Sequence, residues 1–257
     1  MDNQKKTPYG TAVLKAISIL EYLSEKEEAQ GVSEIARGTG LNKPTVFKLL
    51  ETLTLVGWVE KEEREARFRP GLSLIRLAQR SLDQMNVVKL TEPELKQLNE
   101  ETGETVHLGL LDKWQVVYVN KLECKQTVRM YSQIGRTAPL YCTGIGKALL
   151  SCLTEEELGQ FFAETELKPF TPQTITRREE LLQNLEEIRS KGYAVDKGEH
   201  EEEVRCMAIP LQHQNKVYGA VSVSAPRYRT DDERLLRFFT PLENCRRRIL
   251  ERLSAAI

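Results

Sequence analysis

The sequence predicts an α+β protein in which a winged helix-turn-helix comes first, a linker helix follows, and a larger domain with a mostly antiparallel sheet completes the chain. Residues 1–70 carry three helical patterns and then a short charged hairpin. Beyond residue 89, strand patterns are interleaved with long helical patterns. We therefore expect a first domain over 1–70, a linker helix over 71–88 and a second domain over 89–257.

The first domain begins with a helix expected over Thr11–Ser24, and two shorter helices follow it. The apolar residues of the first helix form one stripe at helical spacing, made of Val13, Ala16, Ile17, Leu20 and Leu23. Ser33 is the expected N-cap of the second helix, which Gly38-Thr39-Gly40 ends. Asn42 caps the third, which has Pro44 in its first turn and buries Val46, Leu49, Leu50 and Leu53. Two short helices joined by a glycine turn make a helix-turn-helix.

The third helix presents short hydroxyls and cations outward, which suit phosphates and base edges in a DNA groove. A charged two-stranded wing is expected from Trp58–Lys61 and Ala66–Pro70, with Lys61, Arg64, Arg67 and Arg69 beside the DNA backbone. Eleven basic residues face eleven acidic ones over 1–70, so binding depends on a few placed cations. The expected DNA contacts are Ser33, Asn42, Lys43, Thr45, Lys48 and Arg67. The alternative is a helical domain used only for protein contacts.

The linker helix continues an apolar pattern from Ser73 to about Met85, and we expect it to pack against a second copy of the chain. In the second domain, Thr91 and Glu94 are expected to form a capping box for a helix that ends at Gly103. A hairpin follows, with a turn at Asp112-Lys113 between strands over 105–111 and 116–119. Further strands are expected over 128–131, 194–196, 206–211 and 217–224, and helices over 142–152, 177–191 and 230–253. The last helix opens with a second apparent capping box, Thr230 and Glu233.

Composition limits the class of protein. The chain of 257 residues has 40% hydrophobic and 29% charged residues and a net charge of −1. No apolar stretch approaches the ~20 residues of a membrane span, and the polar start Met1–Thr7 has no signal-peptide core, so we expect a cytoplasmic protein without a membrane partner. The odd number of cysteines and the lack of a C-x-x-C pair argue against disulfides and a tetra-cysteine zinc site. We expect no cofactor and no bound metal. The cysteines are Cys124, Cys142, Cys152, Cys206 and Cys245.

Several motifs in combination resemble the IclR family of regulators, almost from end to end. They are the segment Ser33–Leu53, Thr143-Gly144-Ile145-Gly146-Lys147, Gly192-Tyr193, Arg205-Cys206 and Ser222-Val223-Ser224. The segments 104–109, 129–136 and 139–141 are similar to the branch that represses pectin and hexuronate catabolism and senses 2-keto-3-deoxygluconate. The resemblance implies a GAF-like effector domain, a homodimer, and often a dimer of dimers on palindromic operator DNA.

The resemblance also implies where a small anionic metabolite would bind. The ligand carboxylate would lie on Gly144 and Ile145, at a helix N-terminus whose free amides and positive dipole end accept an anion. Ile145 is larger than the residue usual in the family, which changes the pocket beside the carboxylate. Further wall positions would be Asp196, Cys206, Ser222 and Ser224, with His107 and Arg129 as added donors. The alternative for Gly144 is a simple helix-entry turn, for Cys206 a core thiol, and for Ser222 and Ser224 hydrogen bonds to neighbouring strands. His107 could instead be a core histidine and Arg129 a solvated arginine.

The sequence thus predicts a DNA-binding repressor released by a small keto or sugar acid, with two rival functions. One is a metal-responsive regulator that uses Asp196, His200 and Cys206, although their spacing matches no standard zinc signature and Glu199–Glu203 is typical of a solvated loop. The other is a sugar-acid enzyme with Asp196, His107 or His200 as acid-base groups, for which the sequence offers no nucleotide loop and no catalytic triad.

Overall fold

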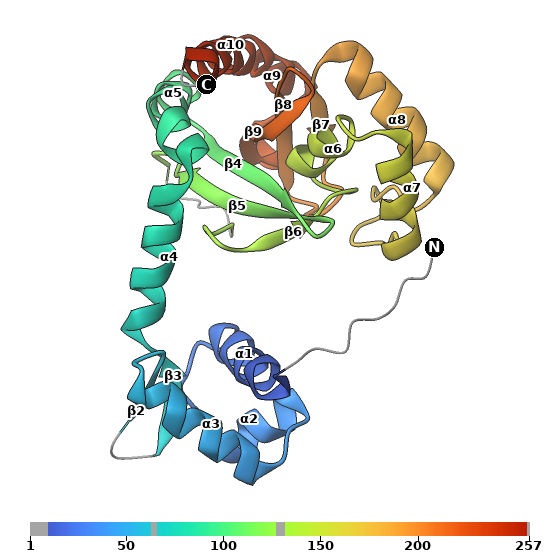
Figure 1. Ribbon diagram of the computed structural model, residues 1–257. Helices are drawn as coiled ribbons and strands as arrows, with labels where there is room; N and C mark the ends of the chain where they lie inside the picture. Colours follow the sequence, from blue (N-terminus) through green and yellow to red (C-terminus); the bar gives the residue numbers. More distant parts are fainter. Residues whose placement is uncertain (1–9, 63–65, 127–131, 256–257) are drawn as a thin grey trace. The chain divides into compact units, whose positions relative to one another are not determined.

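The computed structural model describes residues 10–62, 66–126 and 132–255. The chain divides into two compact units, Met1–Gln84 and Met85–Ile257, drawn in Figure 1. None of the described helices combines the length and the apolar character that a membrane crossing demands.

The first unit is a small helical domain with a three-stranded antiparallel sheet in the order β1-β3-β2. Its core joins side chains of the first three helices to Val59 and Phe68 of the sheet. The elements are α1 Thr11–Ser24, β1 Gln30–Gly31, α2 Val32–Thr39, α3 Lys43–Leu55, β2 Val59–Glu62, β3 Arg67–Pro70 and α4 Leu72–Gln84.

The helix-turn-helix forms as predicted at its turn but not at every cap. Gly40 has the left-handed conformation (φ 68°) that ends α2, and the Asn42 side chain accepts a hydrogen bond from the Thr45 amide at 2.9 Å. Ser33 was wrongly predicted as a cap, because α2 begins at Val32, two residues earlier than that cap implies. Gly31 is the N-cap, and its amide donates to the Glu34 carboxylate at 2.7 Å.

The predicted stripe of α1 is only partly buried. Leu23 lies in the core and Ala16 and Leu20 are half-buried, whereas the side chains of Val13 and Ile17 are exposed. Ile19, which is fully buried, was not part of the predicted stripe. Helical spacing identified an apolar face correctly, but the position of α2 and α3 decides which part of that face is covered. On α4, none of the residues is buried within the chain.

The strand β1 was not predicted, because two residues carry no periodic signal. It pairs Gln30 with Phe68 and Gly31 with Arg67. The Arg67 side chain holds this strand in place, donating to the Ala29 carbonyl at 2.7 Å and to the Glu34 carboxylate at 3.1 Å.

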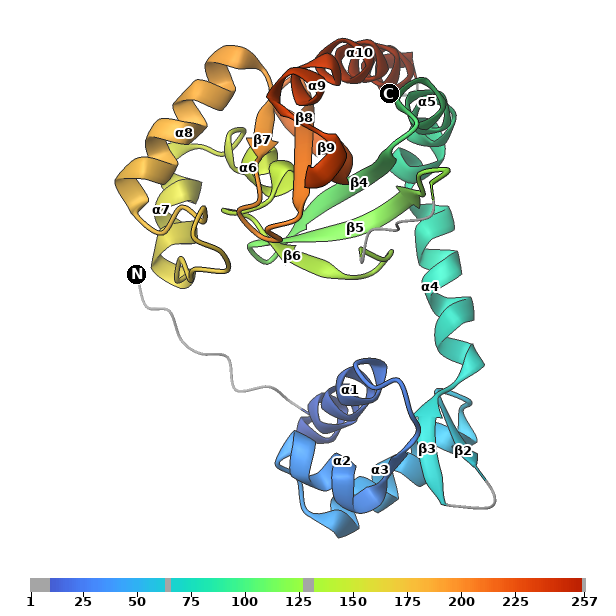
Figure 2. The ribbon, with the colours of Figure 1, turned by 180° about the vertical axis from the view of Figure 1, so that it is seen from behind.

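The second unit is a six-stranded antiparallel sheet in the order β6-β5-β4-β9-β8-β7. Figure 2 shows α5 and α10 together at one side of this sheet, while α6, α7 and α8 lie at the other. The elements are α5 Asn86–Thr102, β4 Thr105–Asp112, β5 Gln115–Leu122, β6 Thr137–Pro139, α6 Gly144–Leu150, α7 Glu155–Glu164, α8 Arg178–Lys191, β7 Ala194–Asp196, β8 Val204–His213, β9 Lys216–Pro226, a 3-10 turn Arg227–Arg229, α9 Asp232–Arg237 and α10 Phe239–Ala255.

The capping box predicted at Thr91 is wrong, because α5 begins at Asn86 and Thr91 lies inside it. The Thr91 hydroxyl donates to the Val87 carbonyl at 2.7 Å, one turn earlier in the same helix. The Glu94 carboxylate reaches α10 instead and accepts hydrogen bonds from Arg248 and Arg252. Its role is therefore to join two helices by ion pairs.

One more helix prediction needs correction, and two elements were missed. The last predicted helix is divided into α9 and α10, and Asp231, not Thr230, caps α9 by accepting from the Arg234 amide at 2.8 Å. Neither α7 nor the short strand β6 was predicted. The strand expected over 128–131 lies outside the described residues.

Candidate functional sites

The first candidate site is the outer face of α3. Lys43, Lys48 and Thr52 are exposed there, and Thr45 is half-buried. Within the described chain, the charges of Lys43 and Lys48 have no ion-pair partner among the salt bridges that the structure forms. Phe47 is also exposed on this helix, to 49%, and the sequence reasoning assigned it to neither face. Two unneutralised cations beside hydroxyls suit contact with a DNA backbone.

The remaining predicted DNA-contact residues have local roles. Ser33 is exposed on the first turn of α2, and the Asn42 side-chain oxygen is occupied by its cap. Arg67 is engaged with Ala29 and Glu34. On the wing, Lys61 lies 3.7 Å from Glu51, and Arg69 pairs with both Glu60 and Glu62. Arg64 lies outside the described residues. Among the described residues of the predicted DNA contacts, only Lys43 and Lys48 on α3 therefore carry charges outside an ion pair.

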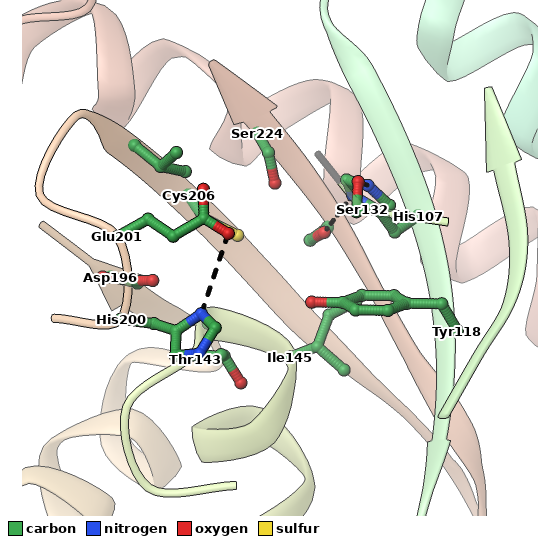
Figure 3. A pocket seen from close by; sticks show the side chains of 13 residues that line it. His107, Tyr118, Ser132, Thr143, Ile145, Asp196, His200, Glu201, Cys206 and Ser224 are labelled. Carbon is green, nitrogen blue, oxygen red and sulfur yellow. Dashed lines mark hydrogen bonds and ion pairs between the residues drawn. The ribbon is translucent and has the colours of Figure 1, made fainter. Parts of the chain in front are cut away.

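The second candidate site is a cavity of about 450 Å³, including its open mouth, between α6 and the sheet of the second unit. Figure 3 shows the side chains around it. Seven of the eight predicted effector residues line it, and the eighth, Arg129, lies outside the described residues. The seven are His107, Gly144, Ile145, Asp196, Cys206, Ser222 and Ser224.

Strand register places the sheet residues of the cavity on one face. Ser224 pairs with Cys206 on one side and with Thr105 on the other, and Ser222 pairs with Ala208 and His107. Because side chains alternate along a strand, residues two apart share a face. His107, Cys206, Ser222 and Ser224 therefore project toward α6 from three neighbouring strands.

The start of α6 forms the opposite wall. The Thr143 hydroxyl caps the helix by accepting from the Gly146 amide at 3.1 Å, and it donates to the Pro139 carbonyl at 2.8 Å. Gly144 and Ile145 are the first two residues of the helix, whose amides have no intrahelical acceptor. A Cβ on Gly144 would lie 2.8 Å from the Cys206 sulfur, so glycine is what allows α6 to lie against β8.

Asp196 is buried at the end of β7. One of its oxygens, Oδ1, accepts from the amides of Gly198 and Glu199 at 3.0 and 2.7 Å. Burial raises the pKa of Asp196 to about 7, with a further contribution from the charge of Glu199. Glu199 itself forms a buried ion pair with Lys147. Asp196 can therefore hold or release a proton near neutral pH.

His107 is a buried, neutral member of the site. One ring nitrogen lies 2.7 Å from the Ser132 hydroxyl and the other 3.4 Å from the Ser222 hydroxyl. Burial, together with the nearby charge of Lys121, lowers the pKa of His107 to about 3. With both nitrogens engaged and no charge near neutral pH, His107 suits a hydrogen-bonding role better than proton transfer.

The three residues of the metal hypothesis all line the cavity, but they do not form a metal site there. No group of three His, Cys, Asp or Glu side chains in the described parts of the chain is arranged to hold an ion. Burial raises the pKa of the Cys206 thiol to about 12, helped by the charge of Asp196, so the thiolate that a metal would need is disfavoured. Burial also lowers the pKa of His200.

Five lining residues were not selected from the sequence. They are Tyr118, Ser132, Thr143, Glu201 and Val204. Thr143 had a usable signal, since it directly precedes the glycine turn where a cap belongs. Tyr118 pairs with Gly109 across the predicted hairpin, but alternation alone does not say which face of that hairpin meets α6.

Comparison with known proteins identifies both units. Residues 12–63 match the family described as IclR helix-turn-helix domain, and residues 79–251 match Bacterial transcriptional regulator IclR C-terminal. The HTH-type transcriptional regulator KdgR of Escherichia coli is 35% identical over 249 residues, which cover 96% of this chain and 94% of KdgR. The E. coli HTH-type transcriptional repressor AllR is 33% identical over 226 residues, covering 88% of this chain and 83% of AllR.

A solved structure shares the fold. The IclR homologue of Microbacterium hydrocarbonoxydans, crystallised with 4-hydroxybenzoate, is 22% identical and superposes with a TM-score of 0.83 over 95% of this chain and 99% of its own. The family and α+β architecture predicted from the motifs are confirmed by the two family matches and the two relatives. The chain therefore belongs to the IclR family of bacterial transcriptional regulators.

Proposed function

We propose that this protein is a repressor that leaves its operator when a small keto or sugar acid, such as 2-keto-3-deoxygluconate, fills the cavity of the second unit. One observation carries the proposal, namely that seven effector residues chosen from the sequence line a single cavity. The similarity to KdgR over nearly the whole chain supports the choice of a sugar acid. The similarity to AllR, a repressor by name, supports repression.

The cavity offers chemistry that suits a polyhydroxy acid. The ligand carboxylate would accept hydrogen bonds from the amides of Gly144 and Ile145, where the helix dipole also favours an anion. Its hydroxyls would meet Asp196, Ser222 and Ser224, which together supply acceptors and donors on the facing wall.

DNA binding follows from the helix-turn-helix domain, and we assign its contacts to α3, with Lys43, Thr45 and Lys48 at the groove. The protein would act as a homodimer, or as a dimer of dimers, on a palindromic operator. The exposed apolar residues Leu72 and Ile75 of α4 support a dimer contact along this helix. Its target being chromosomal DNA, the protein would work in the cytoplasm.

Calorimetry tests the effector assignment. Ser222→Ala and Asp196→Ala should bind 2-keto-3-deoxygluconate roughly five- to a hundred-fold more weakly, because a buried ligand oxygen would lose its partner at a cost of about 1–3 kcal/mol. Ser254→Ala is the matched control, because Ser254 is exposed on α10 and outside the cavity. Wild-type affinity in both cavity variants would contradict the assigned site.

Gel shifts test the direction of the response. With an operator fragment selected from random-sequence DNA, 2-keto-3-deoxygluconate should release the wild type and the Ser254→Ala control. The cavity variants should bind the same DNA equally well but stay bound at that ligand concentration, because a ligand shifts a protein only by its differential affinity for two states. Tighter DNA binding by the liganded wild type would contradict repression relieved by ligand.

A further inference from the structure

The effector cavity has an uneven distribution of charge. The described residues that line it include two acids, Asp196 and Glu201, and no lysine or arginine. Its two histidines do not supply positive charge, because burial lowers the pKa of both His107 and His200. Apart from the start of α6, the described residues that line the cavity therefore present an environment that is neutral or negative.

Glu201 and Asp196 border the same cavity. In Figure 3 the Tyr118 hydroxyl points into it from the side opposite Glu201. The pKa of Tyr118 is raised, first by burial, then by the charges of Cys206, Glu201 and Asp196. Burial is the largest of these causes, and the carboxylates of Glu201 and Asp196 add a smaller contribution.

The nearest lysines are occupied outside the cavity lining. Lys147 is buried on α6 and pairs with Glu199. Lys121 donates to the Ser132 carbonyl and pairs with Glu123 at 2.8 Å. Neither lines the cavity. A second anionic group on a ligand would therefore meet carboxylates without a compensating cation from these lysines.

We propose that Glu201, together with Asp196, makes this cavity selective for monocarboxylates that carry hydroxyl groups and excludes dicarboxylates of the same length. The inference rests on the proposed function, since it assumes that the first carboxylate docks at Gly144 and Ile145. Ionised carboxylates only accept hydrogen bonds, so ligand hydroxyls satisfy them as donors. A second ligand carboxylate has no hydrogen to donate to Glu201 and is repelled by its like charge. Asp196, whose pKa is about 7, adds to this repulsion in its ionised form.

A substitution at Glu201 can separate the effect of charge on ligand selectivity from the effect of pocket shape. Its side chain is 48% exposed and its partner His200 lies 3.9 Å away, a long contact to a residue with a lowered pKa. Changing its charge should therefore leave the fold intact. The neighbouring Glu202 is also exposed, but it faces Arg227 at 3.8 Å and does not line the cavity. Glu202→Gln is thus a control of equal charge change in the same loop.

Calorimetry with two matched ligands tests the inference. They are 2-keto-3-deoxygluconate and the diacid in which its terminal CH2OH is oxidised to a carboxylate. The wild type should bind the diacid at least about tenfold more weakly, since like charges about 5 Å apart near a protein surface repel appreciably. Because solvent screens a half-exposed carboxylate, Glu201→Gln should narrow the ratio of the two dissociation constants roughly three- to tenfold. Glu202→Gln should leave this ratio unchanged.

Each outcome has a distinct meaning. Dissociation constants for the two ligands that agree within about threefold in the wild type would overturn the inference while leaving the proposed function in place. A ratio that does not change in Glu201→Gln would also overturn the role of Glu201, as would an equal change in Glu202→Gln. If neither ligand binds the wild type, the proposed function fails first, and the selectivity inference fails with it.

Discussion

The contact between Gly144 and Cys206 decides how closely α6 approaches the sheet, and it can be tested by a pair of substitutions. Gly144→Ala adds a methyl group that would lie 2.8 Å from the Cys206 sulfur. Non-bonded heavy atoms pack best at roughly 3.5–4.0 Å, so the added carbon would overlap the sulfur by about 1 Å. Cys206→Ala removes that sulfur and opens the space.

The expected magnitudes follow from this geometry. Overpacking should make Gly144→Ala about 1–3 kcal/mol less stable, because both residues are buried and α6 cannot move freely. Cys206→Ala should cost on the order of 1 kcal/mol through the small cavity that it leaves. In the double variant the methyl group meets only the Cβ atoms of residues 206 and 208, each at 3.5 Å, which is an ordinary contact distance. The double variant should therefore be no less stable than Cys206→Ala alone.

Urea unfolding of the wild type, both single variants and the double variant measures the coupling. All four must be compared at one protein concentration, because assembly would make the midpoints depend on concentration. We expect an interaction energy of about 1–3 kcal/mol with unchanged m-values. Free-energy changes that add within about 0.5 kcal/mol would refute the reasoning, since independent sites behave that way.

Packing, DNA contact and a buried histidine give three further tests. Gly146→Ala places a Cβ 2.2 Å from the Leu140 carbonyl oxygen and should lower the free energy of unfolding in urea by about 2 kcal/mol or more. Gly159→Ala on α7 meets nothing within 4 Å and should raise the free energy of unfolding by up to about 1 kcal/mol. Equal midpoints would contradict the packing of α6. Lys48→Ala should weaken operator binding in gel shifts and reduce the salt slope by about one, and an unchanged titration would move the DNA contact away from α3. His107 has a pKa of about 3 in the fold against 6.5 without it, so the unfolded chain binds the extra proton and stability falls as pH drops below 6.5. His107→Gln should therefore lose about 2 kcal/mol less than the wild type between pH 7 and pH 5, and identical profiles would show that the fold does not hold His107 neutral.

The helix-turn-helix was largely predictable because its signals are local. The first helix has the predicted bounds, and Asn42 caps the third helix as expected. The errors arise where a distant segment decides the outcome. Ser33 is not the N-cap, because the Gly31 amide donates to the Glu34 carboxylate and α2 begins there. Arg67 is not free beside the wing, because it donates to the Ala29 carbonyl and to Glu34.

The cavity was predictable where the family motifs and strand alternation agree. Ser222 and Ser224 lie two residues apart on β9, so both face α6 once either does. Glu201 was missed because the run Glu199–Glu203 has the composition of a solvated loop. In the structure this loop divides its roles, since Glu199 pairs with buried Lys147 while Glu201 borders the cavity. The composition of such a run indicates that it is exposed on average, but it cannot say which glutamate is buried and which one borders the cavity.

One four-residue pattern, threonine followed three residues later by glutamate, shows in three of its occurrences where local reasoning stops. Thr154 and Glu157 form a true capping box, because the chain before Thr154 is not helical and its extended backbone directs the hydroxyl to the Glu157 amide at 3.2 Å. Thr91 lies inside α5, so its hydroxyl bonds a carbonyl of the preceding turn, and Glu94 is left to pair with α10. Near the last helices, Asp231 caps in place of Thr230. A capping box thus requires an N-cap residue with an extended backbone and helix amides that have no other acceptor. Both conditions depend on where the helix begins, and the packing of the whole domain decides that position.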